Sequence, residues 1–274
     1  MRQPCALKIA IYTALIGAAV VMVYPFVWSV LSSFKPPEEI LTLEPRLLPR
    51  HATLDNYRTV LGSSGFGRWY LNSLLIAAIV TASVCLFSSL AGYSLAKHRY
   101  AGRQVLFLTI LSTMMIPLEM LVIPWFILAS SLHLVDTYVG ILFPGLISAF
   151  GVFLMRQFMD AVPDSLLESA RMDGAGELKI FFRIVLPIVR PALAALAIFT
   201  FMANWDAFLW PLIVTNEPSM FTLPVGMQAF AGALRVDYHL ILAGANLVVV
   251  PVLVVFIAMQ RQIIEGIALT GLKG

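Results

Sequence analysis

Residues 166–187 read LLESARMDGAGELKIFFRIVLP, a polar interruption in a chain whose neighbouring segments are strongly apolar. Just before it, Pro163 and Asp164 end the preceding helix, and Ser165 is followed three residues later by Glu168. This spacing is typical of a capping box, in which the two residues satisfy backbone N–H groups at a helix start. We therefore predict that a short helix begins at this point.

The short helix is predicted to end in a sharp turn. Gly174 follows Asp173, and glycine tolerates the left-handed backbone conformation that commonly ends a helix. A second helix restarts near Glu177, because the apolar residues beyond it recur at spacings of three and four. These residues are Leu178, Phe181, Phe182, Val185 and Leu186. The pattern predicts a helix, a turn and a helix within residues 160–187.

The composition of the whole chain indicates a membrane protein. Of its 274 residues, 60% are hydrophobic and 12% are charged, whereas a soluble domain carries about 25% charged residues. The net charge of +3 is small and the basic residues are scattered, so we predict no nucleic-acid partner. No histidines or cysteines have the spacing of a metal site. We predict an all-α, polytopic membrane protein.

Six apolar segments have about the 20 residues that a helix needs to cross a bilayer. They cover residues 8–33, 70–95, 105–130, 138–158, 188–212 and 239–260. The first segment is too long for the apolar region of a secretory signal, and no small-residue cleavage site closes it. We therefore predict an uncleaved first span, and six spans leave both termini on the same side.

The distribution of lysine and arginine predicts which side this is, because cytoplasmic segments carry the excess of positive charge. With a cytoplasmic N-terminus, the twelve basic residues inside are Arg2, Lys8, Lys97, Arg99, Arg103, Arg156, Arg171, Lys179, Arg183, Arg190, Arg261 and Lys273. The six outside are Lys35, Arg46, Arg50, Arg58, Arg68 and Arg235. Both termini and residues 160–187 are therefore predicted to be cytoplasmic.

The same topology predicts how the chain is divided. Residues 1–34 form the cytoplasmic N-terminus and the first span. Residues 35–69 form an irregular, proline-containing external loop, with a short surface helix around LDNYRTVL at residues 54–61. Residues 70–262 form a core of five spans, and residues 263–274 form a cytoplasmic tail.

The short cytoplasmic helix is amphipathic and displayed outside the bilayer. Its apolar residues are Leu166, Leu167, Ala170 and Met172, beside Glu168, Arg171 and Asp173. Such a helix can lie on lipid or insert into a groove on a partner. Five acidic residues between positions 160 and 177 offset the nearby basic residues, which disfavours adhesion to anionic lipid. A docked protein is the better interpretation.

This stretch, with Glu168-Ser169-Ala170, Asp173-Gly174 and Leu186-Pro187, resembles the EAA loop of ABC importer permeases. The resemblance extends over nearly the whole chain, through NSLLIA at residues 72–77, FMANWDAFLWPL at residues 201–212 and GLKG at residues 271–274. These segments are similar to carbohydrate-uptake permeases of the maltose and glycerol-phosphate type. Ser169 departs from the alanine that is usual in the family.

The resemblance implies a type I ABC importer permease fold whose cytoplasmic coupling helix docks onto an ATPase. It implies that Glu168, Ser169 and Ala170 begin this helix, that Asp173 and Gly174 make its turn, and that Leu186 and Pro187 lead into span five. The implied partners are ABC ATPase subunits, a second and different permease, an extracytoplasmic solute-binding protein and membrane lipid. The implied location is a bacterial or archaeal inner membrane.

The chain contains no phosphate-binding loop of the G-x-x-x-x-G-K-[ST] type and no catalytic constellation. We therefore expect it not to be an enzyme and to hold no cofactor, with ATP and magnesium on the separate ATPase. The resemblance then implies import of a sugar, oligosaccharide or polyol by alternating access. An ion-coupled secondary carrier that uses Glu119 and Asp206 as a relay remains the alternative.

Charged side chains inside spans are costly and usually face a cavity or a partner. Glu119 in span three and Asp206 in span five are such residues. Asn204, Trp205 and Asp206 together combine an aromatic ring with hydrogen-bonding groups, which suits a sugar. We predict that these residues and Glu119 line the solute path, although Trp205 and Trp210 also fit an interfacial aromatic belt. Asn246 is expected to hydrogen-bond a neighbouring helix.

Overall fold

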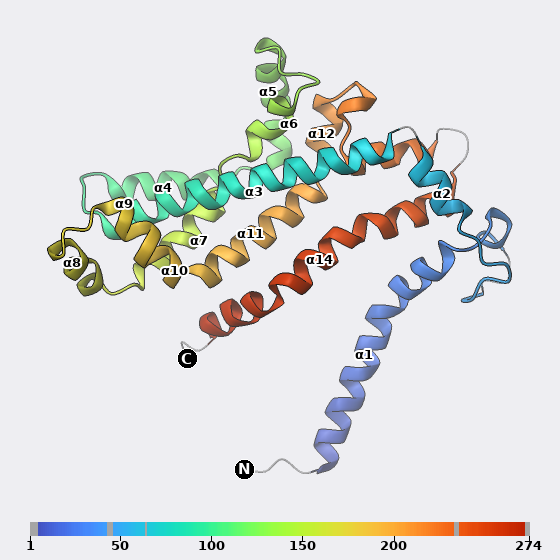
Figure 1. Cartoon of the computed structure of the whole chain (residues 1–274), viewed down its shortest axis with the longest axis horizontal. Helices are drawn as coiled ribbons and strands as arrows, with labels where there is room; N and C mark the ends of the chain where they lie inside the picture. The colour runs from blue at the N-terminus through green and yellow to red at the C-terminus, as the bar shows by residue number, and fades with distance from the viewer. Residues whose placement is uncertain (1–4, 43–45, 64, 233–235, 272–274) are drawn as a thin grey trace. The chain divides into compact units, whose positions relative to one another are not determined.

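The computed structural model describes residues 5–42, 46–63, 65–232 and 236–271, and these contain helices and no strand, as predicted (Figure 1). The basic residues Arg2, Arg235 and Lys273 lie outside the described residues. So does the GLKG motif at residues 271–274, apart from Gly271. The longer helices are α1 (Cys5–Ser32), α2 (Asp55–Gly62), α3 (Phe66–Lys97), α4 (Arg103–Thr113), α5 (Leu118–Ser131), α7 (Ala149–Asp160), α8 (Asp164–Met172), α11 (Arg190–Trp205) and α14 (Tyr238–Gly271). The shorter helices are α6 (Tyr138–Leu142), α9 (Glu177–Ile180), α10 (Leu186–Ile188), α12 (Leu209–Val214) and α13 (Leu223–Met227).

The chain divides into two compact units, which we describe separately. One comprises residues 1–66 and 227–250, and the other residues 67–226 and 251–274. This division follows packing, whereas the boundaries predicted from the sequence follow membrane topology and stay a prediction. The helix α14 continues to Gly271, so most of the predicted tail at residues 263–274 is helical.

The first unit contains α1, the loop that follows it, α2 and the beginning of α14. The predicted short surface helix is confirmed as α2. Asn246 Nδ2 donates to the carbonyl oxygen of Ser29 at 3.2 Å, and Ser29 Oγ donates to Asn246 Oδ1 at 3.4 Å. The expected hydrogen bond from Asn246 to a neighbouring helix is therefore confirmed, and α1 provides the partner.

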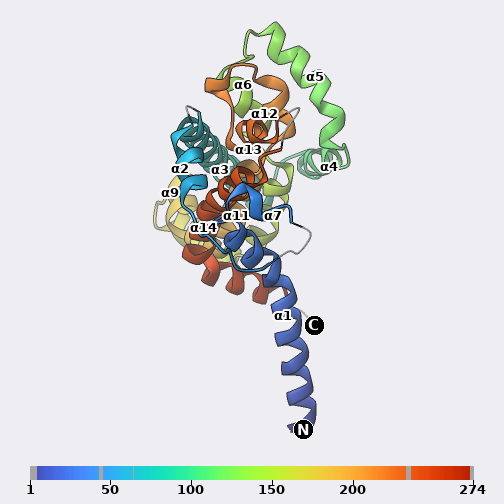
Figure 2. The ribbon, with the colours of Figure 1, turned by 90° about the vertical axis from the view of Figure 1, so that its right-hand side faces the viewer.

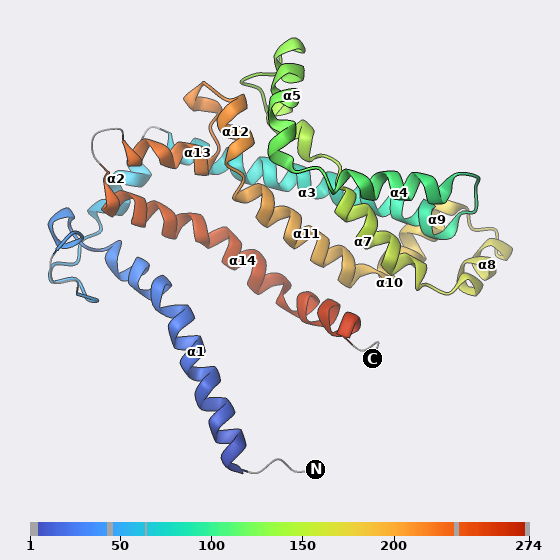
Figure 3. The ribbon, with the colours of Figure 1, turned by 180° about the vertical axis from the view of Figure 1, so that it is seen from behind.

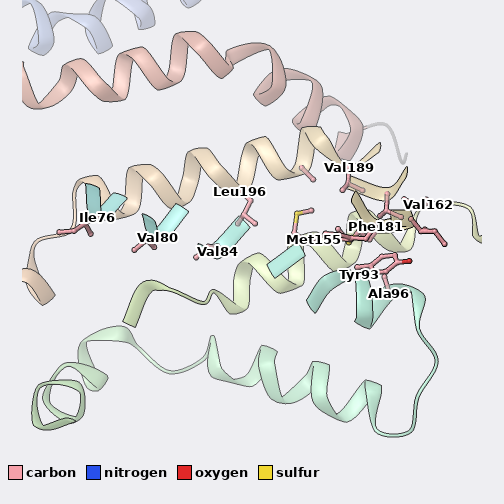
Figure 4. Packing of buried hydrophobic residues seen from close by; sticks show 14 of the residues in the cluster. Ile76, Val80, Val84, Tyr93, Ala96, Met155, Val162, Phe181, Val189 and Leu196 are labelled. Carbon is pink, nitrogen blue, oxygen red and sulfur yellow. The ribbon is translucent and has the colours of Figure 1, made fainter. Parts of the chain in front are cut away.

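The second unit is built around α3, with α7 and α11 packed beside it and α4 beside α7 (Figure 3). One face of α3 is buried at spacings of four, at Ile76, Val80 and Val84. Figure 4 shows these side chains in one cluster with Met155 of α7 and Leu196 of α11. The core of this unit therefore follows the length of α3.

Small residues allow α3 and α7 to approach closely. A Cβ atom at Gly92 would lie 2.8 Å from the backbone nitrogen of Arg156, and one at Gly151 would lie 2.4 Å from Ser88 Oγ. Because lipid supplies no hydrophobic drive for helix association, close packing of this kind is a main source of stability between spans. Ser88 and Gly92 are four residues apart and therefore lie on one face of α3.

Within the part of the chain that the structure describes, three helices are long and apolar enough to cross a membrane, and the number rises to six if each bent helix pair counts as one span. The unbroken helices α3 and α14 contain the predicted spans 70–95 and 239–260, and α1 covers the predicted span 8–33 except for its last residue. The third predicted span, at residues 105–130, is sharply bent, because α4 and α5 meet at 95°. Pro117 causes this break and Pro124 does not, since Pro124 lies inside α5. Figure 2 shows α5 turning away from α4.

The fourth and fifth predicted spans are also interrupted. Residues 138–145 and α7 meet at 45°, and α11 ends at Trp205 before α12 begins at Leu209. Backbone groups freed by a break need partners inside a membrane. Ser83 Oγ donates to the carbonyl oxygen of Leu146 at 2.7 Å, and Ser148 Oγ accepts the N–H of Gly151 at 3.1 Å. Serine side chains thus stabilise the break in span four.

Candidate functional site

The polar stretch forms the predicted helix, turn and helix, but its start differs from the prediction. α8 begins at Asp164, after Pro163 in the N-cap position, and no side chain caps it. The predicted capping box of Ser165 and Glu168 is therefore wrong. Ser165 lies inside the helix, where its carbonyl oxygen accepts a hydrogen bond from Ser169 Oγ at 2.8 Å. With Pro163 as the N-cap, the helix starts two residues earlier than a capping box with Ser165 at the N-cap requires.

The end of α8 agrees with the prediction. Gly174 has a φ of +77°, in the left-handed region. Its N–H bonds to the carbonyl oxygen of Arg171 at 3.0 Å, and the N–H of Ala175 bonds to that of Ala170 at 2.9 Å. These two bonds make a Schellman motif, which satisfies the last carbonyls of the helix. Ala170 and Ala175 also pack together against the core of the unit.

The second helix of the loop begins at Glu177, as predicted, and leads into span five. α9 passes into a π-helical turn over Phe181–Val185 and then into α10, which contains Leu186 and Pro187. The chain then bends by 81° into α11. The missing N–H of Pro187 removes one helical hydrogen bond, which accounts for an irregular turn just before it. Residues 177–188 therefore cannot be the straight beginning of the span that contains α11.

One face of α8 is anchored and the other is free to bind. Leu167 is 1% exposed and lies in the core, and Ala170 is half-buried. On the outer side, Met172 is 88% exposed and Leu166 is 45% exposed. Of the predicted coupling residues, Glu168, Ser169, Asp173 and Gly174 are exposed on α8 and its turn. Pro187 is exposed on α10, and Leu186 beside it is half-buried. We call this exposed surface of α8 and its turn the coupling surface.

A lysine that the sequence did not single out braces the start of α8. The side chain of Lys97, at the end of α3, is 4% exposed, and its Nζ lies 2.7 Å from Asp164 Oδ1. Nζ also donates to the carbonyl oxygens of Asp160, the last residue of α7, and of Val162 in the connection that follows. A buried ammonium group needs such partners. These partners are 63 to 67 residues away in the chain, so local sequence patterns give no sign of them.

Glu177 braces the other end of α8. Its carboxylate accepts a hydrogen bond from Arg171 Nε at 2.7 Å and one from the hydroxyl of Tyr93 at 2.8 Å. His98 Nε2 lies 3.3 Å from the same carboxylate. The Arg171 guanidinium is the main cause that lowers the pKa of Glu177 to about 2, with Tyr93 adding to it. Glu177 thus joins α8, α9 and the C-terminal end of α3 as an ionised group.

The predicted solute-path residues lie outside the coupling surface, and they differ in how much of each is exposed. Asp206 is exposed at the end of α11, and Glu119 is exposed in the first turn of α5. Asn204 is half-buried, and its Nδ2 donates to the carbonyl oxygen of Thr200 at 2.8 Å. Their role in solute contact stays a prediction.

Trp205 and Trp210 do not form an interfacial belt in this chain. Trp205 is 0% exposed and packs edge-on against Tyr70 and parallel to Phe201. Trp210 is 8% exposed, and its Nε1 donates to the carbonyl oxygens of Gly140 and Ile141. Trp205 therefore supports Asn204 and Asp206 from within the core, and a direct contact with solute would need it to become exposed.

The fold and site together define a class of protein: an integral membrane protein whose bent spans carry a braced, partly exposed helix on one side. The chain belongs to the family described as binding-protein-dependent transport system inner membrane component, whose model matches residues 86–264, more than half of the chain. It is therefore a multi-pass permease component of an inner membrane. The predicted ABC importer permease family is confirmed.

Curated relatives agree with this family over most of their lengths. The arabinooligosaccharides transport system permease protein AraQ of Bacillus subtilis is 36% identical over 270 residues, covering 97% of this chain and 96% of that protein. The lactose transport system permease protein LacG of Rhizobium radiobacter is 34% identical, covering 93% of each. The sn-glycerol-3-phosphate transport system permease protein UgpE of Yersinia pestis is 36% identical over 208 residues, covering 75% of this chain and 74% of that protein.

A solved structure has the same fold. One chain of a bacterial ABC transporter involved in the import of the acidic polysaccharide alginate matches with a TM-score of 0.85 at 24% identity. The match covers 95% of this chain and 98% of that chain. A chain of the MetNI methionine ABC transporter matches with a TM-score of 0.55, covering 74% of this chain and 96% of that chain. The predicted ABC importer permease fold is therefore confirmed.

Proposed function

We propose that this chain is the permease subunit of an ATP-driven importer that takes up a sugar, an oligosaccharide or a polyol-type solute. The coupling surface of α8 carries this proposal. Lys97 and Glu177 hold α8 against the rest of the unit, and the opposite side of the helix exposes apolar and acidic side chains. The transport systems named for the relatives, for arabinooligosaccharides, lactose and sn-glycerol-3-phosphate, support the solute class.

The partners follow from this role. ABC ATPase subunits bind the coupling surface, with Met172 and Leu166 entering a groove of the ATPase. A second and different permease completes the membrane pore, and an extracytoplasmic binding protein delivers the solute. ATP and magnesium are bound and used by the ATPase, and this chain performs no catalysis. Both termini and the coupling surface lie in the cytoplasm, as the distribution of lysine and arginine indicates.

Transport proceeds by alternating access. When ATP draws the two ATPase subunits together, each carries its docked coupling helix with it, because Lys97 and Glu177 hold α8 to the rest of the permease. The spans then reorient and open the path towards the loaded binding protein. Asn204 and Asp206, supported by the buried Trp205, contact the solute, and Glu119 lines the same path.

Co-purification tests the proposal. The chain is tagged at its C-terminus, the complex is extracted gently from native membranes, and its components are identified by mass spectrometry. We expect to recover an ATPase with a phosphate-binding loop and a second, related permease. Met172→Ala should reduce the recovery of the ATPase and leave that of the second permease unchanged. Recovery of the tagged chain by itself, active in liposomes with only a proton gradient, would show a secondary carrier instead.

A further inference from the structure

The NSLLIA segment at the start of span two has a role that the coupling surface does not use. Asn72 is 1% exposed. Its Nδ2 donates to the carbonyl oxygens of Ser219 and Phe221, each at 2.9 Å, and its Oδ1 accepts from the hydroxyl of Tyr138 at 2.7 Å. Both carbonyls belong to residues 215–222, which connect α12 to α13 and which we call the outer loop. Asn72 therefore uses both of its Nδ2 protons to hold this loop.

Neighbouring residues of α3 hold the same loop and the first residue of α13, where the loop ends. Ser73 is also 1% exposed, and its Oγ accepts the N–H of Leu223 at 2.8 Å. Trp69 Nε1 donates to the carbonyl oxygen of Pro218 at 2.8 Å. Because these are bonds from buried side chains to main-chain atoms, they constrain the path of the loop rather than one of its side chains. The residues at positions 216–219 are exposed, and hydrogen bonds from α3 therefore fix the backbone of the loop that carries them.

The opposite end of α3 holds the coupling helix in the same manner. Lys97 pairs with Asp164 and bonds the carbonyls that precede α8, and Tyr93 bonds Glu177, which in turn holds Arg171. One helix thus makes polar contacts, through side chains of its own that are buried, with two segments that lie far apart in the sequence. Because α3 spans the membrane, its two ends lie on opposite sides, and so do the two segments.

Between these ends α3 is continuous. It runs for 32 residues without a proline or a break, a length of about 48 Å at about 1.5 Å per residue. The helix pairs α4 with α5 and α9–α10 with α11, by contrast, are bent by 95° and 81°. A continuous helix transmits a displacement along its axis or a rotation about it, whereas a bent pair can absorb either at the bend.

We propose that α3 carries the movement of the coupling helix to the outer loop, with Lys97 and Tyr93 as positioning residues at its inner end and Asn72 at its outer end. This inference rests on the proposed function. ATP-driven closure moves α8, the braces pass this movement to α3, and the outer loop changes position because its backbone is bonded to the far end of α3.

Asp136 anchors the outer loop independently and provides a control. Its Oδ1 accepts the N–H groups of Asn216 at 2.6 Å and Glu217 at 2.8 Å, and Asp136 lies outside α3, between α5 and α6. Asp136 has a φ of 56°, a conformation that asparagine tolerates well. Asp136→Asn therefore weakens one anchor of the loop and leaves the bonds from α3 in place.

The experiment follows the outer loop with a thiol probe, which avoids any dependence on the identity of the solute. Cys5 and Cys85 are replaced by serine, and Ser219→Cys places a thiol on the exposed part of the outer loop. The whole complex that co-purifies with the tagged chain is treated with a maleimide, with and without magnesium-ATP. The readout is the ratio of the two labelling rates in the otherwise unchanged chain, in Lys97→Met, in Asn72→Leu and in the controls Arg99→Gln, Arg68→Gln and Asp136→Asn.

We expect ATP to change the labelling rate by about fivefold or more, the lower end of the range for coupled sites. Lys97→Met and Asn72→Leu should each reduce this change to less than about twofold, while the ATPase still co-purifies. Arg68 and Arg99 are exposed near the two ends of α3, so their variants should keep the full change, as should Asp136→Asn. An unchanged response to ATP in Lys97→Met and Asn72→Leu overturns the proposal.

Two milder variants keep the test valid if a stronger one fails to assemble. Tyr93→Phe and Tyr138→Phe each remove a single hydroxyl, from the contact with Glu177 or with Asn72. Both should lower the response to ATP, and a full response in both overturns the proposal. If no ATPase co-purifies even with the unsubstituted chain, the proposed function itself fails, an outcome distinct from an assembled complex in which α3 carries no movement.

Discussion

Lys97 Nζ lies 2.7 Å from Asp164 Oδ1, which joins the last residue of α3 to the first residue of α8 across 67 positions of sequence. The two side chains differ in environment, since that of Lys97 is 4% exposed and that of Asp164 is 66% exposed. The ion pair therefore faces water on its acidic side, where screening limits its strength. Its main effect is geometric, because the buried lysine also holds the two carbonyls that precede α8.

Changing Gly174 should uncouple the permease. A residue with a Cβ atom pays about 1–2 kcal/mol in the left-handed conformation, and proline cannot adopt a φ of +77° at all. We expect Gly174→Pro to abolish ATPase binding and transport while the protein still inserts in the membrane, and Gly174→Ala to weaken both.

Gly176 is the matched control for this turn. Its φ is −71° and a Cβ atom there meets open space, so Gly176→Ala should leave ATPase recovery and uptake unchanged. ATPase recovery is measured by co-purification and insertion by the amount of protein in washed membranes. Normal uptake by Gly174→Pro would refute the assignment of the coupling turn.

Two apolar residues of α8 should affect different properties. Leu167→Ala removes a side chain that is 1% exposed, so we expect a loss of about 2–5 kcal/mol in stability. Met172→Ala removes one that is 88% exposed, so the melting temperature should stay constant. The affinity for the purified ATPase should instead fall by about fivefold or more, as for an interface residue worth over 1 kcal/mol. Equal effects of the two variants on melting temperature would contradict the orientation of α8.

The ionised state of Glu177 should matter most at neutral pH. Because Arg171 and Tyr93 lower its pKa from 4.5 to about 2, the carboxylate stabilises the fold above the unfolded pKa, and this contribution disappears as pH falls from about 4.5 towards about 2. Glu177→Gln should therefore loosen the loop at pH 8, seen as faster tryptic cleavage after Arg171 or Lys179. The difference in melting temperature between this variant and the unsubstituted protein should vanish at the acidic end. A difference that grows on acidification would reverse the assigned sign.

Substitutions in the predicted solute path should separate transport from assembly. Asn204→Ala and Asp206→Asn are expected to lower uptake by about tenfold, the loss of roughly one hydrogen bond to a charged or polar group, with ATPase recovery unchanged. Uptake of labelled lactose, arabinotriose and glycerol phosphate is compared in the reconstituted complex. Unchanged uptake of all three would remove these residues from the path, whereas proton-driven uptake that needs Glu119 would favour a secondary carrier.

The predicted elements rest on local patterns that the structure reproduces. Gly174 could be recognised because only a residue without Cβ adopts its conformation cheaply, and Glu177 because the apolar spacing resumes there. The capping-box prediction places the start of α8 two residues late, since Ser165 and Glu168 have the spacing of a capping box and yet Pro163 occupies the N-cap. A local pattern shows which helix starts a segment can form, and a neighbouring residue, here Pro163, determines which of them forms.

By itself, the sequence determined that this is an all-α membrane protein with a helix, turn and helix between spans four and five, because run length, charge and glycine act within a few residues. Tertiary structure alone decided that Lys97 is a buried brace, that Trp205 is fully enclosed and that Asn72 holds the outer loop. Their partners lie up to 149 positions away, as Asn72 and Phe221 do. Such contacts depend on how helices pack, and no periodicity along the chain encodes them.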